Sequence, residues 1–250
     1  MAIRDDAHRN HDALFPNHVS TLKKTDPELI EVFDNWAFGD VLEDTTLDIR
    51  TRLMVQLAAM IACHAVSEYR VMLGAALHVG VTPVETKEIV YQAVPYVGMA
   101  RVFDFLHATN EVLQSRGIAL PLAGQSTTTT ETRFAKGLEA QKRIFGERIE
   151  DMRAVAPKDQ LHIQDFLASN CFGDYYTRGG LDLKTRELLT LSMLAALGGC
   201  EVQLAGHVAG NLGVGNDRAV LVTTITQLLP FIGYPRALNA LRVINEGTSS

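Results

Sequence analysis

The feature that most constrains the fold is an internal repeat that covers most of the chain. Residues 172–191, FGDYYTRGGLDLKTRELLTL, align with residues 38–57, FGDVLEDTTLDIRTRLMVQL, at a spacing of 134. After a slip of one residue near Gly198 and Gly199, the match resumes at a spacing of 135, with identical pairs at Leu212/Leu77, Gly215/Gly80, Pro230/Pro95, Gly233/Gly98 and Arg236/Arg101. A repeat of this length is one structural unit used twice. We therefore expect two similar units related by a pseudo-two-fold axis.

The spacing of apolar residues predicts that each unit is helical. Thr82, Pro83 and Glu85 have the residue types of the N-cap, N1 and N3 positions of a helix, and Gly80 is suited to end the helix before them. After Gly98 the apolar residues again recur at helical spacing. No stretch shows the alternation of a β-strand, so the predicted fold class is all-α.

Changes in composition set the expected boundaries of the units. The polar run GQSTTTTET ends a segment, residues 118–132, that is typical of a linker. The first unit is expected over residues 19–117 and the second over residues 133–247. Residues 1–18 are polar, include His8, His11 and His18, and show no apolar period, so we expect a loose arm there.

Composition and charge exclude several classes of protein. Of the 250 residues 47% are hydrophobic and 21% are charged, which is enough apolar material for a sizeable core. A net charge of -6 without a Lys/Arg cluster argues against a nucleic-acid partner. The longest apolar runs, such as residues 188–200, are too short to cross a bilayer. The N-terminal residues lack the apolar core of a secretory signal, and three cysteines without a C-x-x-C pair suit a reducing compartment, so we expect a cytoplasmic protein.

Candidate site residues cluster in the second unit. Cys200 and His207 are seven residues apart on a predicted helix that follows Gly198 and Gly199. Seven residues are two helical turns, so the thiol and the imidazole share one face, with Gln203 between them. Glu187 lies near the start of the preceding helix. The first unit has Ala65, Glu68 and Met72 at the positions of Cys200, Gln203 and His207, and no acid at that of Glu187, which places the expected chemistry in the second unit.

The run LDLKTRELLTLSMLAALGGC, with HVAGNLGVG downstream, resembles the carboxymuconolactone decarboxylase family, which also includes the alkylhydroperoxidase D proteins. The resemblance implies an all-helical fold that assembles into rings, commonly of six family units. A tandem chain would then form a trimer with six repeats, or a dimer. The alkylhydroperoxidase branch carries a glutamate and then C-x-x-C-x-x-x-H. Cys200 and His207 match its first cysteine and its histidine, and Glu187 is near the glutamate position, but Gln203 replaces the second cysteine, so a disulfide cycle within the motif is unavailable.

The leading hypothesis is an enzyme that decarboxylates a small carboxylated lactone or oxo acid without a cofactor or a metal. Loss of carbon dioxide leaves a carbanion or enolate, so the site needs a proton donor and groups that hold negative charge. His207 is the expected donor, and Glu187 is its partner or a second acid/base. Arg178 occurs only in the second unit and could bind a substrate carboxylate through two parallel bonds. Gln203, on the same face as His207, is a further candidate for substrate binding.

Two alternatives remain open at this level. Cys200 could act alone as a peroxide-reducing thiol that an external thiol regenerates, since a helix N-terminus lowers the pKa of a thiol. The repeats could also build a ring-forming binding protein without catalysis, in which His207 is a core histidine bonded to a backbone carbonyl and Cys200 is a small buried hydrophobe. Arg52 and Arg186 occupy equivalent positions in both units, which favours a structural role for them.

Overall fold

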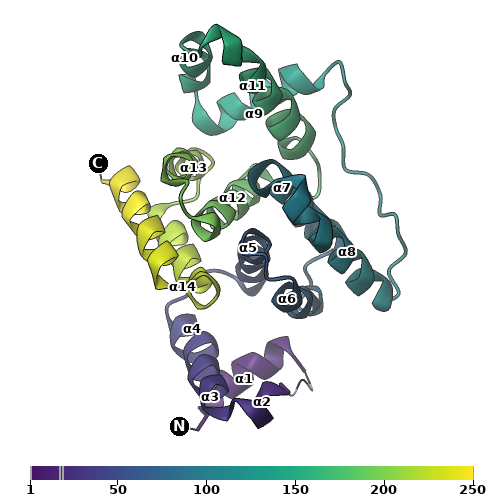
Figure 1. The fold of residues 1–250 in the computed structure, drawn as a ribbon, viewed down its shortest axis with the longest axis vertical. Helices are drawn as coiled ribbons and strands as arrows, with labels where there is room; N and C mark the ends of the chain where they lie inside the picture. Colours follow the sequence, from purple (N-terminus) through teal and green to yellow (C-terminus); the bar gives the residue numbers. More distant parts are fainter. Residues whose placement is uncertain (1, 17, 19, 250) are drawn as a thin grey trace.

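The computed structural model describes residues 2–16, 18 and 20–249, and within these ranges every regular element is a helix (Figure 1). The predicted all-α class is therefore confirmed. No helix of the described residues is both long and apolar enough to span a membrane.

The two repeats have the same helices in the same order. In the first repeat these are α5 (Ile49–Ala62), α6 (Val66–His78), α7 (Pro83–Val97) and α8 (Met99–Ser115). In the second they are α12 (Leu183–Leu197), α13 (Glu201–Gly213) and α14 (Arg218–Thr248). Helix α14 has non-helical backbone at Gly233, with φ of 75°, and thus corresponds to α7 and α8 together, which meet at Gly98 with φ of 83°. A positive φ is accessible to glycine at little steric cost, and this explains why both repeats keep glycine at that bend.

Side-chain caps fix where the helices begin. The Asp48 carboxylate accepts hydrogen bonds from the backbone N–H groups of Arg50 and Thr51, and the carboxylate of its counterpart Asp182 accepts one from Thr185. Thr82 and Glu85 form the predicted capping box at the start of α7. Because Asp48 and Asp182 are equivalent caps, α5 and α12 begin at equivalent residues of the two repeats. Equivalent side chains then face the core in both helices.

The two repeats share one core. Helices α5 and α12 lie against each other in the middle of the molecule, α12 also packs on α7, and α5 packs on α14 (Figure 1). Each of these contacts has its reciprocal, which is the pattern that a pseudo-two-fold axis produces. Residues 52–62 of α5 and 186–196 of α12 are buried without interruption. Helices that are covered on all sides in this way hold the repeats in a fixed relation.

A layer of π-helical turns precedes the core in each repeat. These turns are η1 (Trp36–Asp40), between α3 (Pro27–Asn35) and α4 (Val41–Glu43), and η3 (Leu167–Tyr176), after α10 (Arg148–Ala154), η2 (Lys158–Gln160) and α11 (Leu161–Phe166). Helix α9 (Arg133–Phe145) packs closely on η3. A Cβ atom on Gly137 of α9 would lie 1.8 Å from the carbonyl oxygen of Ala168, so glycine is required for this approach. The contact brings α9 over the end of α13.

The expectation of a loose N-terminal arm is wrong for its described residues. Residues Asp5–Leu14 form α1, which lies on η1 and α3, and a short α2 (Leu22–Thr25) follows. Ala7, His11 and Leu14 of α1 are buried at helical spacing, and Arg4 forms an ion pair of 2.6 Å with Asp40. The many charged neighbours of these three residues hide the apolar stripe in the sequence. Helix α1 thus covers η1 in the first repeat much as α9 covers η3 in the second.

The segment between α8 and α9 has no helix and runs along the outside of the molecule (Figure 1). It is attached to the second repeat by backbone and side-chain hydrogen bonds. The N–H of Gly179 donates to the carbonyl of Gln125 over 2.9 Å, and the hydroxyl of Thr127 donates to the carbonyl of Thr177 over 2.8 Å. We call residues 118–125 of this segment the strap.

Candidate active site

The structure brings Glu187 and His207 together. Nδ1 of His207, on α13, lies 2.9 Å from Oε2 of Glu187, on α12, and both side chains are almost fully buried. An ionised carboxylate only accepts hydrogen bonds, so Nδ1 carries the hydrogen and Nε2 faces the other way. The amide of Asn211 donates to the backbone carbonyls of both Glu187 and His207, over 3.0 and 2.8 Å. The Asn211 amide thus links α12 and α13 next to the Glu187–His207 pair.

Two tyrosines complete the polar cluster. The Tyr176 hydroxyl, from η3, donates to Oε1 of Glu187 over 2.8 Å and lies 2.9 Å from the hydroxyl of Thr190. The Tyr96 hydroxyl, from α7, lies 2.8 Å from that of Tyr176 and 3.3 Å from Nε2 of His207. Burial raises the pKa of both phenols well above its usual range. Both tyrosines are therefore neutral hydrogen-bond donors, and one of them comes from the first repeat.

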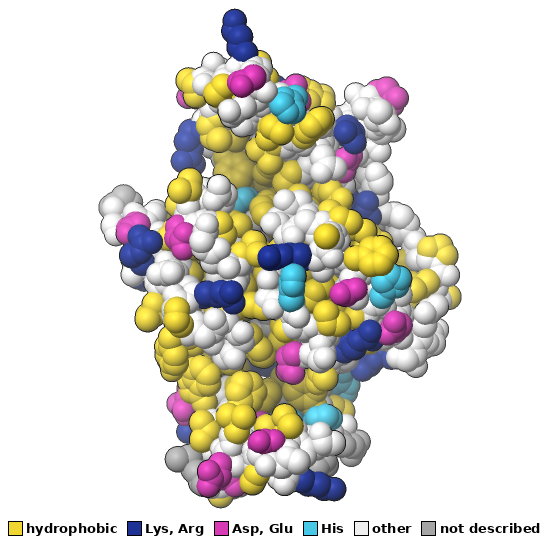
Figure 2. Space-filling model, in the orientation of Figure 1, with side chains coloured by type: hydrophobic (Ala, Val, Ile, Leu, Met, Phe, Trp, Pro, Cys, Tyr) yellow, Lys and Arg dark blue, Asp and Glu magenta, His cyan; other side chains and the backbone are white. Residues whose placement is uncertain are grey.

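A cavity of about 680 Å³ opens beside His207. His207, Gln203 and Cys200 line one side of it, and Phe145, Arg148 and further residues of α9–α11 line the other. In Figure 2 a hollow with mainly hydrophobic walls separates α9–α11, at the top of the view, from the body of the molecule. The cavity is large enough for a small organic molecule and presents it to the imidazole.

Cys200 lines the same cavity, and its surroundings raise the pKa of its thiol. It is the N-cap residue of α13, as the sequence suggests. The thiol of Cys200 donates to the carbonyl oxygen of Leu194 over 3.3 Å. Burial raises the pKa of this thiol, and the nearby carboxylate of Glu201 raises it further. The expected lowering by the helix N-terminus is thus reversed. Cys171, also at the cavity wall, has its pKa raised to about 12 by burial.

Arg178 does not lie at this cavity. Its guanidinium binds Glu88 through Nε and a terminal nitrogen over 2.9 to 3.0 Å and covers the ring of Tyr91. The arginines at the His207 cavity are Arg148 and Arg153. Arg153 is paired with Asp165 over 2.5 Å, whereas the exposed Arg148 has no ion-pair partner in the described part of the chain. Arg148 is thus an unpaired cation at the wall of this cavity within the described residues, and Arg178 lies elsewhere.

The equivalent place in the first repeat lacks the acid, the imidazole and both phenols of this cluster. The register of α5 and α12 pairs Arg186 with Arg52 and Glu187 with Leu53. Five residues of the site have apolar counterparts: His207 is replaced by Met72, Glu187 by Leu53, Tyr176 by Leu42, Tyr96 by Phe231 and Cys171 by Ala37. A small hollow lined by Met72 and Phe231 marks the position. The tyrosines were missed in the sequence, although their apolar counterparts mark them as specific to one site.

Among the described residues, no three His, Cys, Asp or Glu side chains gather into a possible metal site. What the fold and the site define is an all-helical tandem-repeat protein with a buried acid–histidine pair at a small-molecule cavity. The model of the carboxymuconolactone decarboxylase family matches residues 27–111 and 162–246, and the chain belongs to this family. It is similar to 4-carboxymuconolactone decarboxylase of Acinetobacter baylyi, with 29% identity over 117 residues, which are 46% of this chain and 87% of that protein.

Proposed function

We propose that this protein decarboxylates a small carboxylated lactone or oxo acid without a cofactor, with His207 as the proton donor. The observation that carries the proposal is the position of His207, which is held by Glu187 on one nitrogen and faces Tyr96 and the cavity with the other. The relative of similar sequence bears the name of such an enzyme.

The groups at the cavity suit each step of this reaction. Breaking the bond between carbon and the carboxylate releases neutral carbon dioxide and leaves an electron pair that spreads onto a carbonyl as an enolate. A largely apolar wall favours the loss of the carboxylate charge, and the neutral phenol of Tyr96 can donate to the enolate oxygen. Protonated His207 then transfers the proton on Nε2 to the carbon, and solvent returns a proton to the imidazole. Glu187 stabilises the cationic imidazole, and Arg148 attracts the anionic substrate.

The test is turnover of 4-carboxymuconolactone, measured as release of carbon dioxide. His207→Ala should lower kcat by about 100-fold or more, because general acid catalysis contributes about this much. Met72→Ala alters the equivalent position of the first repeat and should leave kcat unchanged. Thermal unfolding of both variants shows whether they fold. If His207→Ala folds and turns over like the parent protein, His207 is not the proton donor.

The same assay distinguishes the other two functions. Cys200→Ser should leave decarboxylation nearly unchanged, whereas a peroxide reductase would lose all activity with this substitution. Because Cys200 is bonded to a carbonyl and its pKa is raised, its environment favours the protonated, unreactive thiol. A protein that turns over neither lactones nor peroxides would instead be a binding protein.

We also propose that the chain forms a homo-oligomer, most simply a trimer with six repeats. Several large apolar side chains on the helices of the second repeat are exposed in the single chain. Val202 is 81% exposed, Leu238 61% and Tyr234 58%. Contact with further copies would cover such residues, in keeping with the ring assembly that the family resemblance implies.

A further inference from the structure

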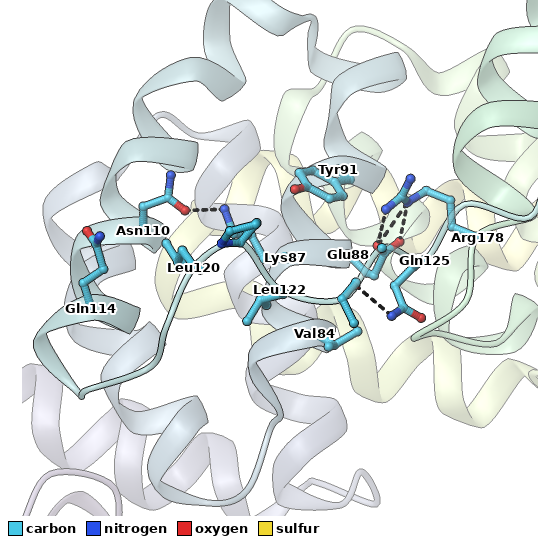
Figure 3. A pocket seen from close by; sticks show the side chains of 13 residues that line it. Val84, Lys87, Glu88, Tyr91, Asn110, Gln114, Leu120, Leu122, Gln125 and Arg178 are labelled. Atoms are coloured by element: carbon cyan, nitrogen blue, oxygen red, sulfur yellow. Dashed lines mark hydrogen bonds and ion pairs between the residues drawn. The ribbon is translucent and has the colours of Figure 1, made fainter.

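A second cavity, of about 460 Å³, lies beneath the strap, beside the first half of α7 (Figure 3). Lys87, Glu88 and Tyr91 of α7 point toward it, and Arg178 reaches it from the second repeat. We propose that this cavity binds a small organic carboxylate whose charged group pairs with Lys87. The site does not depend on the reaction proposed for His207.

Lys87 is a half-buried cation without a counterion. Its only hydrogen-bond partner in the described part of the chain is the side-chain oxygen of Asn110, which is neutral (Figure 3). Burial lowers the pKa of Lys87, which indicates that its charge is poorly compensated in the empty cavity. An anion beside Nζ would remove this cost, and the amide of Asn110 would still orient the ammonium group.

The carboxylate nearest to Lys87 along α7 is already committed. Glu88 is 1% exposed at its side chain and lies between two guanidinium groups, Arg178 at 2.9 Å and the buried Arg186 at 2.9 Å. One carboxylate thus already has two arginine partners. At the cavity wall itself, Lys87 and Arg178 give two positive charges against the one negative charge of Glu88, and Tyr91 is the remaining titratable group there. A carboxylate from outside is the complementary ligand.

The rest of the wall selects a ligand with an apolar body over an inorganic anion. Val84 and the strap residues Leu120 and Leu122 line one part of the cavity, and the ring of Tyr91 lies between the two cations (Figure 3). Nζ of Lys87 is 5.9 Å from the centre of this ring, and Cζ of Arg178 is 4.9 Å from it. A flat carboxylic acid such as benzoate could place its charge at Lys87 and its ring against the leucines.

The site is not a by-product of the repeated fold. The counterparts of Lys87, Glu88 and Tyr91 in the second repeat are Val222, Thr223 and Thr226, and Asp44 replaces Arg178. The second repeat is thus without these charges, and the strap passes over the first repeat's copy of the position. The positive charges, the ring of Tyr91 and the strap thus occur together at this position of the first repeat and are missing at the equivalent position of the second. A specific binding site would show this difference.

The experiment is isothermal titration of the full chain with sodium benzoate, and with benzamide and inorganic phosphate as matched probes. Benzoate should bind with saturation, and benzamide, which has the same shape but no charge, should bind at least tenfold more weakly. Phosphate, which has charge but no apolar body, should also bind more weakly. Equal binding of either probe would overturn the proposal, as would the absence of benzoate binding at millimolar concentration.

Substitutions locate the binding within the molecule. Lys87→Met should weaken benzoate binding at least tenfold, Lys87→Arg should retain most of it, and Lys158→Met, at an exposed lysine elsewhere, should leave it unchanged. Thermal unfolding shows whether Lys87→Met is folded, and the Arg variant keeps the test valid if it is not. Benzoate could also enter the His207 cavity. Binding that persists in Lys87→Met but is lost in Arg148→Met would assign it there and refute the proposed site.

Discussion

The hydroxyl of Tyr96 lies 3.3 Å from Nε2 of His207, although Tyr96 belongs to α7 of the first repeat and His207 to α13 of the second. The same hydroxyl lies 2.8 Å from that of Tyr176. The polar cluster is therefore built from both repeats, and the second repeat alone would lack the hydroxyl that faces Nε2 of His207. The first repeat thus contributes a side chain to the polar cluster of the second.

Replacing Tyr96 tests this contribution. Tyr96→Phe installs the residue type of the counterpart Phe231, so the ring should still fit, but the donor toward the enolate is lost. We expect kcat for decarboxylation to fall by about tenfold or more, since a donor to a developing oxyanion is worth at least this much. The melting temperature should change little. Tyr91→Phe, on the same helix but at the cavity under the strap, is the control and should keep full activity; equal losses in both variants would contradict the assignment.

The fold could be predicted because its signals are local. Thr82, Pro83 and Glu85 define a helix start by their own chemistry, and Gly98 and Gly233 mark equivalent bends at a fixed spacing in the repeat. Glu187 and His207 could likewise be named as candidates, since a motif contains both. The N-terminal helix was missed because its three buried residues are outnumbered by charged ones, and its stability depends on η1, which is distant in the sequence.

The partners of the site residues could not be predicted, because they depend on how the repeats pack. Tyr96 and His207 are 111 positions apart, and Arg178 and Glu88 are 90 apart. The sequence shows no partner for Arg178 and so suggests a substrate-binding role. In the structure Arg178 pairs with the buried carboxylate of Glu88, on α7. A comparison of the two repeats position by position would have identified the tyrosines, since Leu42 and Phe231 stand at the equivalent positions.

The raised pKa of Cys200 predicts how its reactivity depends on pH. An unperturbed thiol has a pKa of about 8.5, and the thiolate is the form that reacts. Because burial and Glu201 raise the pKa, Cys200 should remain protonated at pH 8 and react with iodoacetamide more slowly than glutathione does. The rate should rise only at a pH above the range in which the glutathione thiol ionises, because the pKa of Cys200 is raised. Mass spectrometry assigns the label to Cys200, and labelling at pH 7 as fast as that of glutathione would instead support a peroxide-reducing thiol.

The proposed trimer predicts a molar mass of about three times that of the 27.4 kDa chain at micromolar concentration. Light scattering coupled to size-exclusion chromatography measures this mass directly. Leu238→Lys should lower it, because a charge would enter an apolar contact, whereas Thr130→Lys, at an exposed residue of the polar segment before α9, should not. A mass near that of one chain for the parent protein would refute the assembly.

Arg186 and Arg52 occupy equivalent positions, but the same substitution should change the free energy of unfolding by very different amounts at the two positions. Arg186 is fully buried and donates to Glu88, to Gln92 and to the backbone carbonyls of Arg178 and Gly179. Arg52 has no side-chain partner within the described residues, because Thr223 stands where Glu88 would be, and burial lowers its pKa.

Arg186→Met should therefore lower the free energy of unfolding by about 3–5 kcal/mol, since it leaves the buried Glu88 with one partner fewer. Arg52→Met removes a charge that nothing compensates and should cost less than about 1 kcal/mol or stabilise the protein. Urea unfolding of the two variants measures both values. Similar losses would mean that Arg52 has a partner in the assembled protein, and that the ion-pair network of Arg186 contributes little beyond the packing of its side chain.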